Sequence, residues 1–206
     1  LSADGTRVAV GAPGNSDGGT DSGSVRVLEI TEVTELGTTW TQLGDDIDGE
    51  ATNDFLGNSV SLSADGARVA VGAVGNDGGG SGAGSVRLFE LSGTTWTQLG
   101  GDIDGEAAGD GSGLSVSLSA DGTRVAVGAP LYDGGGGTNS GRIRVFEFVN
   151  GDWTQVCADI DGESFNDFYG WAVALSDDGV CLAGGAPTND NGGNNAGQVR
   201  AYTCPR

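Results

Sequence analysis

An all-β fold made of repeated four-stranded antiparallel sheets is predicted by three features of the sequence. Leu1-Ser2-Ala3-Asp4-Gly5 and the residues after it return almost unchanged, in units that start near residues 1, 62, 118 and 175. Within each unit apolar and polar residues alternate over short segments, a period of two that indicates β-strands. No segment keeps a helical period for more than two turns. Units of four strands repeated every roughly 50–60 residues are typical of propeller blades, so residues 1–206 are expected to form one β-propeller domain.

The second unit shows the four strands expected in each blade. The first strand covers residues 58–63, where serines alternate with Val60 and Leu62. An Asp-Gly turn at 64–66 supports a tight hairpin into the second strand, residues 68–73. A long loop of Gly, Asp, Ser and Asn leads to the third strand, residues 85–91. A second turn leads to the fourth strand, residues 95–99.

Side chains at matching places in the units predict how neighbouring blades pack. The small residues of the second strand fit the crowded centre of a propeller. One tryptophan recurs on the fourth strand, and we expect it to pack between blades at the wide outer edge; the three copies are Trp40, Trp96 and Trp153. One arginine recurs on the third strand and is expected to form ion pairs between blades; the four copies are Arg26, Arg87, Arg144 and Arg200.

These units resemble the FG-GAP repeat of the integrin α-chain type. The resemblance rests on an Asp-Phe-x-Gly turn followed by a Gly-Ala-Pro end of the second strand, and it extends over the whole chain. The matching segments are Asp54–Gly57, Asp167–Gly170, Gly11–Pro13, Gly128–Pro130 and Gly185–Pro187. The resemblance implies a propeller that has about seven blades in the family. The chain departs from the pattern at Val74 and at Gly111-Ser112-Gly113. The family's calcium loop is absent between the first two strands, so the motif carries no calcium site over to this chain.

The strand count leaves the ring incomplete. The first unit lacks its inner strand and the last lacks its outer strand, which gives about 3.5 blades. Three explanations stay open: an ordered piece of a longer propeller, two chains that complete one ring, or an irregular closed ring of four blades. The first two are favoured. In both, the open flanks are expected to contact further blades from the same or another chain.

Acidic loops are the candidate functional site. An Asp-Ile-Asp-Gly-Glu segment with a later aspartate recurs in three units and is expected beside the Gly-rich loops on one face. Ca²⁺ prefers six to eight such oxygen ligands. Capping of turns by these carboxylates is the competing interpretation. The candidate metal ligands are Asp46, Asp48, Glu50, Asp54, Asp102, Asp104, Glu106, Asp110, Asp159, Asp161, Glu163 and Asp167.

The three cysteines lie in the last quarter of the chain. If Ala186 lies opposite Val199 in the last hairpin, Cys181 faces Cys204, and a disulfide is predicted between them. Such a bond would indicate an oxidising, extracellular or cell-surface setting. Two buried free thiols are the alternative. Cys157 is left unpaired, either as a small residue that fills space on an outer strand or as an intermolecular link.

Composition excludes several functions. The net charge is −20, all nine basic residues are Arg, and there is no His, Lys or Met. Binding of nucleic acid or anionic lipid needs clustered basic residues, and any histidine-dependent catalysis is impossible. No stretch approaches the roughly 18 apolar residues of a membrane helix. Nothing at Leu1 resembles a signal peptide, so a mature form or a fragment is expected.

Acidic loops, counted together with the Gly- and Asp-rich loops, recur in every unit, whereas a catalytic site should mark one unit with residues that the others lack. The sequence therefore favours a non-enzymatic extracellular module for adhesion or structural assembly that binds a protein or glycan partner, with calcium as the candidate ligand. The alternative is a carbohydrate-acting hydrolase or lyase that uses paired loop carboxylates. An acidic surface adapted to salt is a third interpretation.

Overall fold

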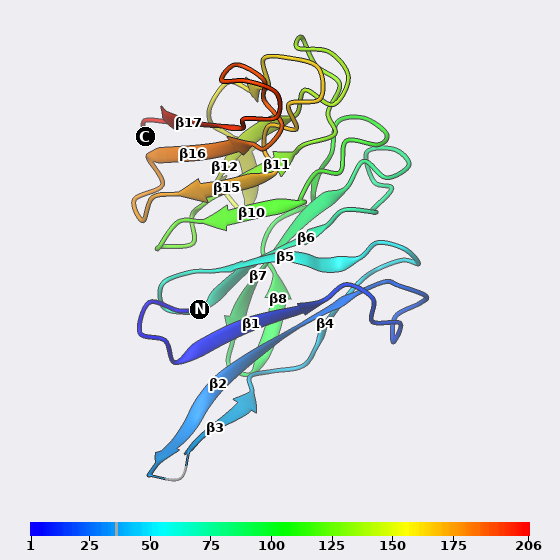
Figure 1. The fold of residues 1–206 in the computed structure, drawn as a ribbon. Coiled ribbons are helices and arrows are strands. Elements are labelled where there is room, and N and C mark those ends of the chain that lie inside the picture. The colour runs from blue at the N-terminus through cyan, green and yellow to red at the C-terminus, as the bar shows by residue number, and fades with distance from the viewer. Residues whose placement is uncertain (36) are drawn as a thin grey trace.

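A computed structural model describes residues 1–35 and 37–206, and within them every regular element is a β-strand. The strands form four antiparallel sheets that fan out in sequence order (Figure 1). The first sheet contains β1 (Arg7–Ala12), β2 (Ser24–Thr34), β3 (Gly37–Gln42) and β4 (Ile47–Asp48). The second contains β5 (Leu56–Leu62), β6 (Arg68–Ala73), β7 (Ser85–Ser92), β8 (Thr95–Gln98) and β9 (Ile103–Asp104). The all-β prediction is therefore confirmed.

The last two sheets complete the fan. The third contains β10 (Ser115–Leu118), β11 (Arg124–Ala129), β12 (Arg142–Val149), β13 (Asp152–Gln155) and β14 (Ile160–Asp161). The fourth contains β15 (Ala172–Leu175), β16 (Cys181–Ala186) and β17 (Gln198–Thr203). The first and fourth sheets lie at opposite ends of the fan (Figure 1). A closed ring of four blades, the least favoured sequence interpretation, is not the arrangement found.

The acidic segments contribute two-residue strands that were predicted as loops. β4, β9 and β14 pair with the start of the longest strand of their own sheet, which is β2, β7 and β12 respectively, beyond the end of the short outer strand. Their isoleucines turn inward, and Ile47 and Ile103 are each only 4% exposed. Burial of this apolar residue explains why the segment extends along the free edge instead of staying in solvent.

The Asp-Gly turns form as predicted, and each is held by a serine and an aspartate. In the second unit Ser63 Oγ donates to Asp65 Oδ1 at 2.6 Å, and the Ala67 amide donates to the same oxygen at 3.0 Å. Gly66 takes a φ of 64°, the left-handed conformation that favours glycine. In the first unit the same bonds, led by that from the Thr6 amide, lower the pKa of Asp4 to about 2.

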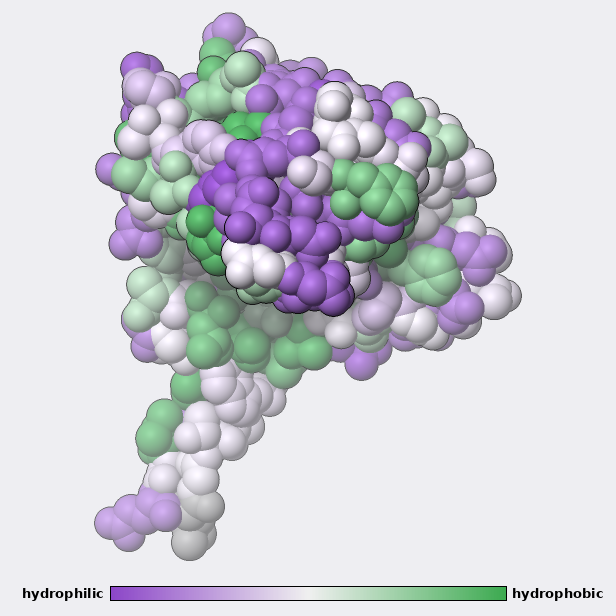
Figure 2. All heavy atoms as spheres, turned by 45° about the horizontal axis from the view of Figure 1, so that its top comes forward, coloured by the Kyte–Doolittle hydropathy of each residue, from purple (hydrophilic) through white to green (hydrophobic). Residues whose placement is uncertain are grey.

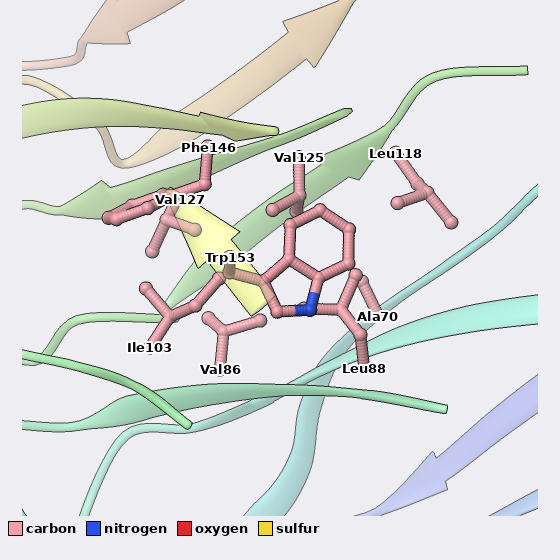
Figure 3. Packing of buried hydrophobic residues seen from close by; sticks show 9 residues of the cluster. All are labelled: Ala70, Val86, Leu88, Ile103, Leu118, Val125, Val127, Phe146 and Trp153. Carbon is pink, nitrogen blue, oxygen red and sulfur yellow. The ribbon is translucent and has the colours of Figure 1, made fainter. Parts of the chain in front are cut away.

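The apolar core lies between successive sheets. Between the second and third sheets Trp153 lies among Val86, Leu88 and Val125 (Figure 3). Its indole Nε1 donates to the Leu99 carbonyl oxygen of the preceding sheet at 2.7 Å. Trp96 makes the equivalent bond to Leu43 at 2.8 Å. The prediction that these tryptophans pack between blades is confirmed for Trp96 and Trp153.

Candidate functional site

The recurring arginines join each sheet to the acidic segment of the sheet before it. Arg87 Nη2 donates to the Asp48 carbonyl oxygen at 3.0 Å, and its Nη1 lies 3.0 Å from Glu50. Arg144 and Arg200 repeat this geometry at the next two junctions, with bonds of 2.6 and 2.7 Å to the equivalent carbonyl oxygens. The predicted inter-blade role is confirmed for these three arginines.

Arg26 is the exception. No sheet precedes the first one within the described residues, and Arg26 instead pairs with Asp46 of its own sheet at 2.8 Å. The guanidinium side chain is 53% exposed, compared with 6% for Arg87. The hydrogen bond from Arg26 holds the pKa of Asp46 below its ordinary value. The prediction of an inter-blade ion pair is wrong for Arg26, because the described residues include no sheet before the first one.

The first aspartate of each acidic segment is tied to a glutamine four residues earlier. Gln42 Nε2 donates to Asp46 at 2.6 Å and Gln98 to Asp102 at 2.6 Å. Gln155 donates to Asp159 at 2.7 Å. These carboxylates therefore fix the path of the chain between the outer strand and the short strand that follows.

The last aspartate of each segment caps a turn. Asp54, Asp110 and Asp167 are buried, and each accepts a bond from the backbone amide three residues earlier, at 2.9, 3.0 and 2.9 Å. Burial raises the pKa of Asp110 above its ordinary value. The capping interpretation is the one that the structure shows for these three side chains.

The acidic segments lie beside the Gly-rich loops, as predicted. The amide of Gly49 donates to the carbonyl oxygen of Gly23 at 2.9 Å, and the next two units repeat the bond at 2.7 Å. Within residues 1–35 and 37–206, however, the structure brings no three acidic or cysteine side chains into a group that could hold a metal ion. The twelve candidate ligands are spread over three loops, and most of their carboxylates are engaged in the ion pairs and hydrogen bonds described above and below.

Arg142 forms a charged cluster that the sequence analysis missed. Its guanidinium pairs with Asp159 at 2.8 Å and Asp161 at 2.7 Å, and also with Glu106 of the preceding sheet. It stacks on the Tyr132 ring, 3.7 Å from the centroid. Burial lowers the pKa of Arg142, but the bond to Asp161 and the surrounding carboxylates outweigh it and raise the pKa. The sequence does contain a signal for this cluster, because arginine occupies a repeat position at which the other units have Ser24, Ser85 and Gln198.

Two further candidate ligands have different surroundings. Glu163 pairs with Arg200 at 3.3 Å and accepts a bond from Asn191 at 3.1 Å. Asp104 has a buried Oδ1 without a hydrogen-bond donor among the described residues. Burial, with the nearby Asp102 charge, raises the pKa of Asp104.

The predicted disulfide between Cys181 and Cys204 is wrong. Cys204 bonds to Cys157, with Cα atoms 6.0 Å apart, and Cys181 is free and exposed. The last hairpin pairs Ala186 with Gln198, one residue away from the assumed register, so Cys181 lies opposite Thr203. A shift of one residue moves a side chain to the other face of a sheet. The bond found ties the segment after β13 to the end of β17, and so joins the third and fourth sheets.

Replacing Cys157 with serine is expected to lower the free energy of unfolding by about 2–4 kcal/mol, because the bond closes a long loop between two sheets. Urea denaturation measures the change. The matched control is Cys181→Ser, which removes an exposed free thiol and should shift stability by no more than about 0.5 kcal/mol. A larger loss in the control would contradict the pairing.

The free flank of the fourth sheet carries a hollow of 390 Å³. Its lining includes Trp171, Gly185, Pro187 and Val199. Val199 is 75% exposed and Trp171 50% exposed. The face of the molecule drawn in Figure 2 is largely hydrophilic and is interrupted by hydrophobic patches. The other end of the fan also has exposed apolar side chains, with Val10 49% and Trp40 39% exposed.

Comparison with known proteins supports the fold and the repeat. Residues 47–89 match the family model of the FG-GAP repeat. Among solved structures, a protein from Agrobacterium tumefaciens assigned as TolB has 18% identity and a TM-score of 0.52, covering 98% of this chain and 56% of that one. The periplasmic gluconolactonase of Pseudomonas aeruginosa has 14% identity and a TM-score of 0.56, covering 96% and 49%. A search of curated proteins finds no match.

These identities show the fold alone, and the chain spans about half the length of those two structures. The fan of sheets and the likeness to these proteins define the class: this is a β-propeller protein. The match at residues 47–89, which run from β4 of the first sheet to β7 of the second, confirms the resemblance to the FG-GAP repeat seen in the sequence.

Proposed function

We propose that this protein is an extracellular, non-enzymatic β-propeller module for structural assembly or adhesion, which uses its two open flanks to bind further propeller sheets from the same or another chain. The observation that carries the proposal is the exposure of side chains that are buried in the other units. Val71 of the second sheet is fully buried, whereas its first-sheet equivalent Val10 is 49% exposed. Val25 and Val86 are fully buried, whereas their fourth-sheet equivalent Val199 is 75% exposed.

The two flanks are complementary to each other. The open face of the first sheet carries the same residue types as the face of the second sheet that packs against the first. The open face of the fourth sheet carries the same residue types as the face of the first sheet that packs against the second. Within the chain these two surfaces meet in a core that contains Val25, Val69 and Val71. Exposed apolar surfaces of this kind mark interaction sites, and stacked repeats gain stability from nearest-neighbour contacts. If the module is adhesive, a protein or glycan partner binds at the same flanks.

Self-association is therefore expected to depend on the flanks. Sedimentation velocity should show a mass that rises with concentration, and Val199→Arg should return the protein to the monomer because it places a charge in the contact. The control is Val33→Arg at the tip of the β2–β3 hairpin, where Val33 is 73% exposed. A chain that stays monomeric at all concentrations, or that associates equally well with both variants, would contradict assembly through the flanks.

Calcium binding by the acidic loops is a separate part of the proposal. Its support is Asp104, because a buried carboxylate oxygen without a donor is a ligand atom that a cation would satisfy. Titration calorimetry with calcium, and melting in chelator, test it. Heat of binding that is lost in Asp104→Asn would support the site. The absence of binding heat, together with an unchanged melting temperature, would contradict calcium binding. The proposed assembly through the flanks would be unaffected.

An extracellular setting is supported by the disulfide between Cys157 and Cys204, since such bonds persist in oxidising compartments. In the part of the chain that the structure describes, no helix is long and apolar enough to cross a membrane.

A carbohydrate-acting enzyme is the alternative function. The solved structures with this fold include a gluconolactonase, and burial raises the pKa of Asp104, which is the direction that favours a general acid. Turnover of lactones or glycosides that collapses in Asp104→Asn would contradict the non-enzymatic proposal. We expect no turnover, because the acidic segments recur in three units without one distinguished carboxylate pair, and Glu106, Asp159 and Asp161 are engaged in ion pairs with Arg142.

A further inference from the structure

The hollow on the fourth sheet faces away from the rest of the protein. A side chain at Gly184 would meet Ile143 of the third sheet, so this position faces inward. Successive residues of a strand point to opposite faces, so Gly185 faces outward. Among the described residues, the nearest atom to a side chain at Gly185 would belong to Ala172 of the same sheet, 3.8 Å away.

The junction between the third and fourth sheets shows what fills an equivalent hollow. There the turn of the following unit, Phe168-Tyr169-Gly170, enters the space. The Tyr169 amide donates to the Ser140 carbonyl oxygen at 3.0 Å, and Tyr169 forms a parallel bridge with Gly141. A methyl group on Gly128 would lie 2.1 Å from the Gly170 carbonyl oxygen, so the two backbones touch.

The first two junctions repeat this contact. Leu56 bridges Gly23 and donates its amide to Ser22 at 3.0 Å. Ser112 bridges Gly84 and donates to Ala83 at 2.9 Å. The residue before the glycine is thus Leu, Ser or Tyr, which shows that the backbone makes the contact and the side chain is free to vary.

The glycine of the turn is the invariant part of these contacts within the chain. Gly57, Gly113 and Gly170 have φ values of 90°, 84° and 91°, which other residues rarely adopt. A methyl group on Gly57 would approach the Val25 side chain to 3.0 Å, and Gly170 packs against Ile143 in the same way. Val25 and Ile143 are fully buried by this contact, whereas Val199 is 75% exposed.

The geometry points to a fourth junction of the same kind as the three within the chain. The hollow binds the Phe-x-Gly turn of a further repeat unit, where x is the variable residue before the glycine. The amide of residue x donates to the Ala196 carbonyl oxygen, its backbone bridges Gly197, and the glycine covers Gly185 and Val199. This inference deepens the proposed assembly function, because it names the segment through which a further unit docks.

A synthetic peptide with the sequence of residues 51–62 tests the inference. Trp171 lines the hollow and is half exposed, so binding should shift its fluorescence to shorter wavelength in a saturable way. The matched peptide with Gly57→Val should bind at least about tenfold more weakly, because its backbone disfavours the required φ. No saturable shift with the native peptide, or equal binding of the two peptides, would overturn the inference.

Protein variants locate the binding. Val199→Arg should lose the shift, and Val33→Arg, at a position of similar exposure, should keep it. If Val199→Arg does not fold, Gly185→Val fills the hollow from the neighbouring strand instead. Binding that survives in the folded hollow variant would overturn the inference. If the peptide does not bind but flank-dependent self-association is observed, only this inference is contradicted. If the peptide binds and the protein stays monomeric, only the proposed self-association is contradicted.

Discussion

Replacing Trp153 with alanine should lower the free energy of unfolding by about 3–5 kcal/mol. The indole is 9% exposed and packs in the core between the second and third sheets (Figure 3). The substitution leaves a cavity and also removes the donor to the Leu99 carbonyl oxygen, 2.7 Å away. Urea denaturation followed by circular dichroism measures the loss.

The matched control is Trp40→Ala. Trp40 occupies the same repeat position on the first sheet but is 39% exposed, because no sheet covers it in the described part of the chain. Its replacement should cost about 1 kcal/mol, in line with the smaller area that it removes from water. Equal losses for the two variants would show that the first sheet is covered in solution.

Replacing Arg124 with leucine is expected to cost about 3–5 kcal/mol, because it leaves the partners of a buried charge unpaired. Arg124 is 1% exposed and lies 3.2 Å from Glu147. Its Nη1 also donates to the carbonyl oxygens of Cys204 at 2.7 Å and Gly179 at 3.1 Å. This one side chain therefore fastens the end of the fourth sheet to the third.

Arg7→Leu is the control for this prediction. Arg7 is the equivalent residue of the first unit and pairs with Glu29 at 2.8 Å, but its side chain is 23% exposed. A pair that is partly open to water contributes about 0–1 kcal/mol. Thermal unfolding of both variants should separate them clearly, and a similar loss in each would contradict the burial of Arg124.

The repeat made most of the fold predictable from the sequence. Alternation around Val60 and Leu62, the Asp-Gly turns and the recurrent tryptophans placed the long strands and the packing between sheets correctly. The count of three, four, four and three long strands also agrees with the structure. These features depend on local pattern and on burial, which each unit repeats.

Errors arose where tertiary contacts decide the outcome. Cys181 and Cys204 were paired on an assumed register that differs by one residue from the one found. Ile47 was placed in a loop, although its burial makes a short strand. Arg26 lacks the neighbour that its position in the repeat implies. The acidic candidates were identified as residues, but their division into turn caps and ion pairs depends on side-chain geometry that the sequence pattern does not contain.

Amide hydrogen exchange at low and high protein concentration shows whether both flanks are uncovered junction surfaces that bind further sheets. We expect slower exchange at high concentration in β1 and in residues 185–199, with no change at the tip of the β2–β3 hairpin. Val199→Arg should abolish the added protection. Added protection that appears only in the acidic loops, or nowhere, would show that the flanks do not bind further sheets.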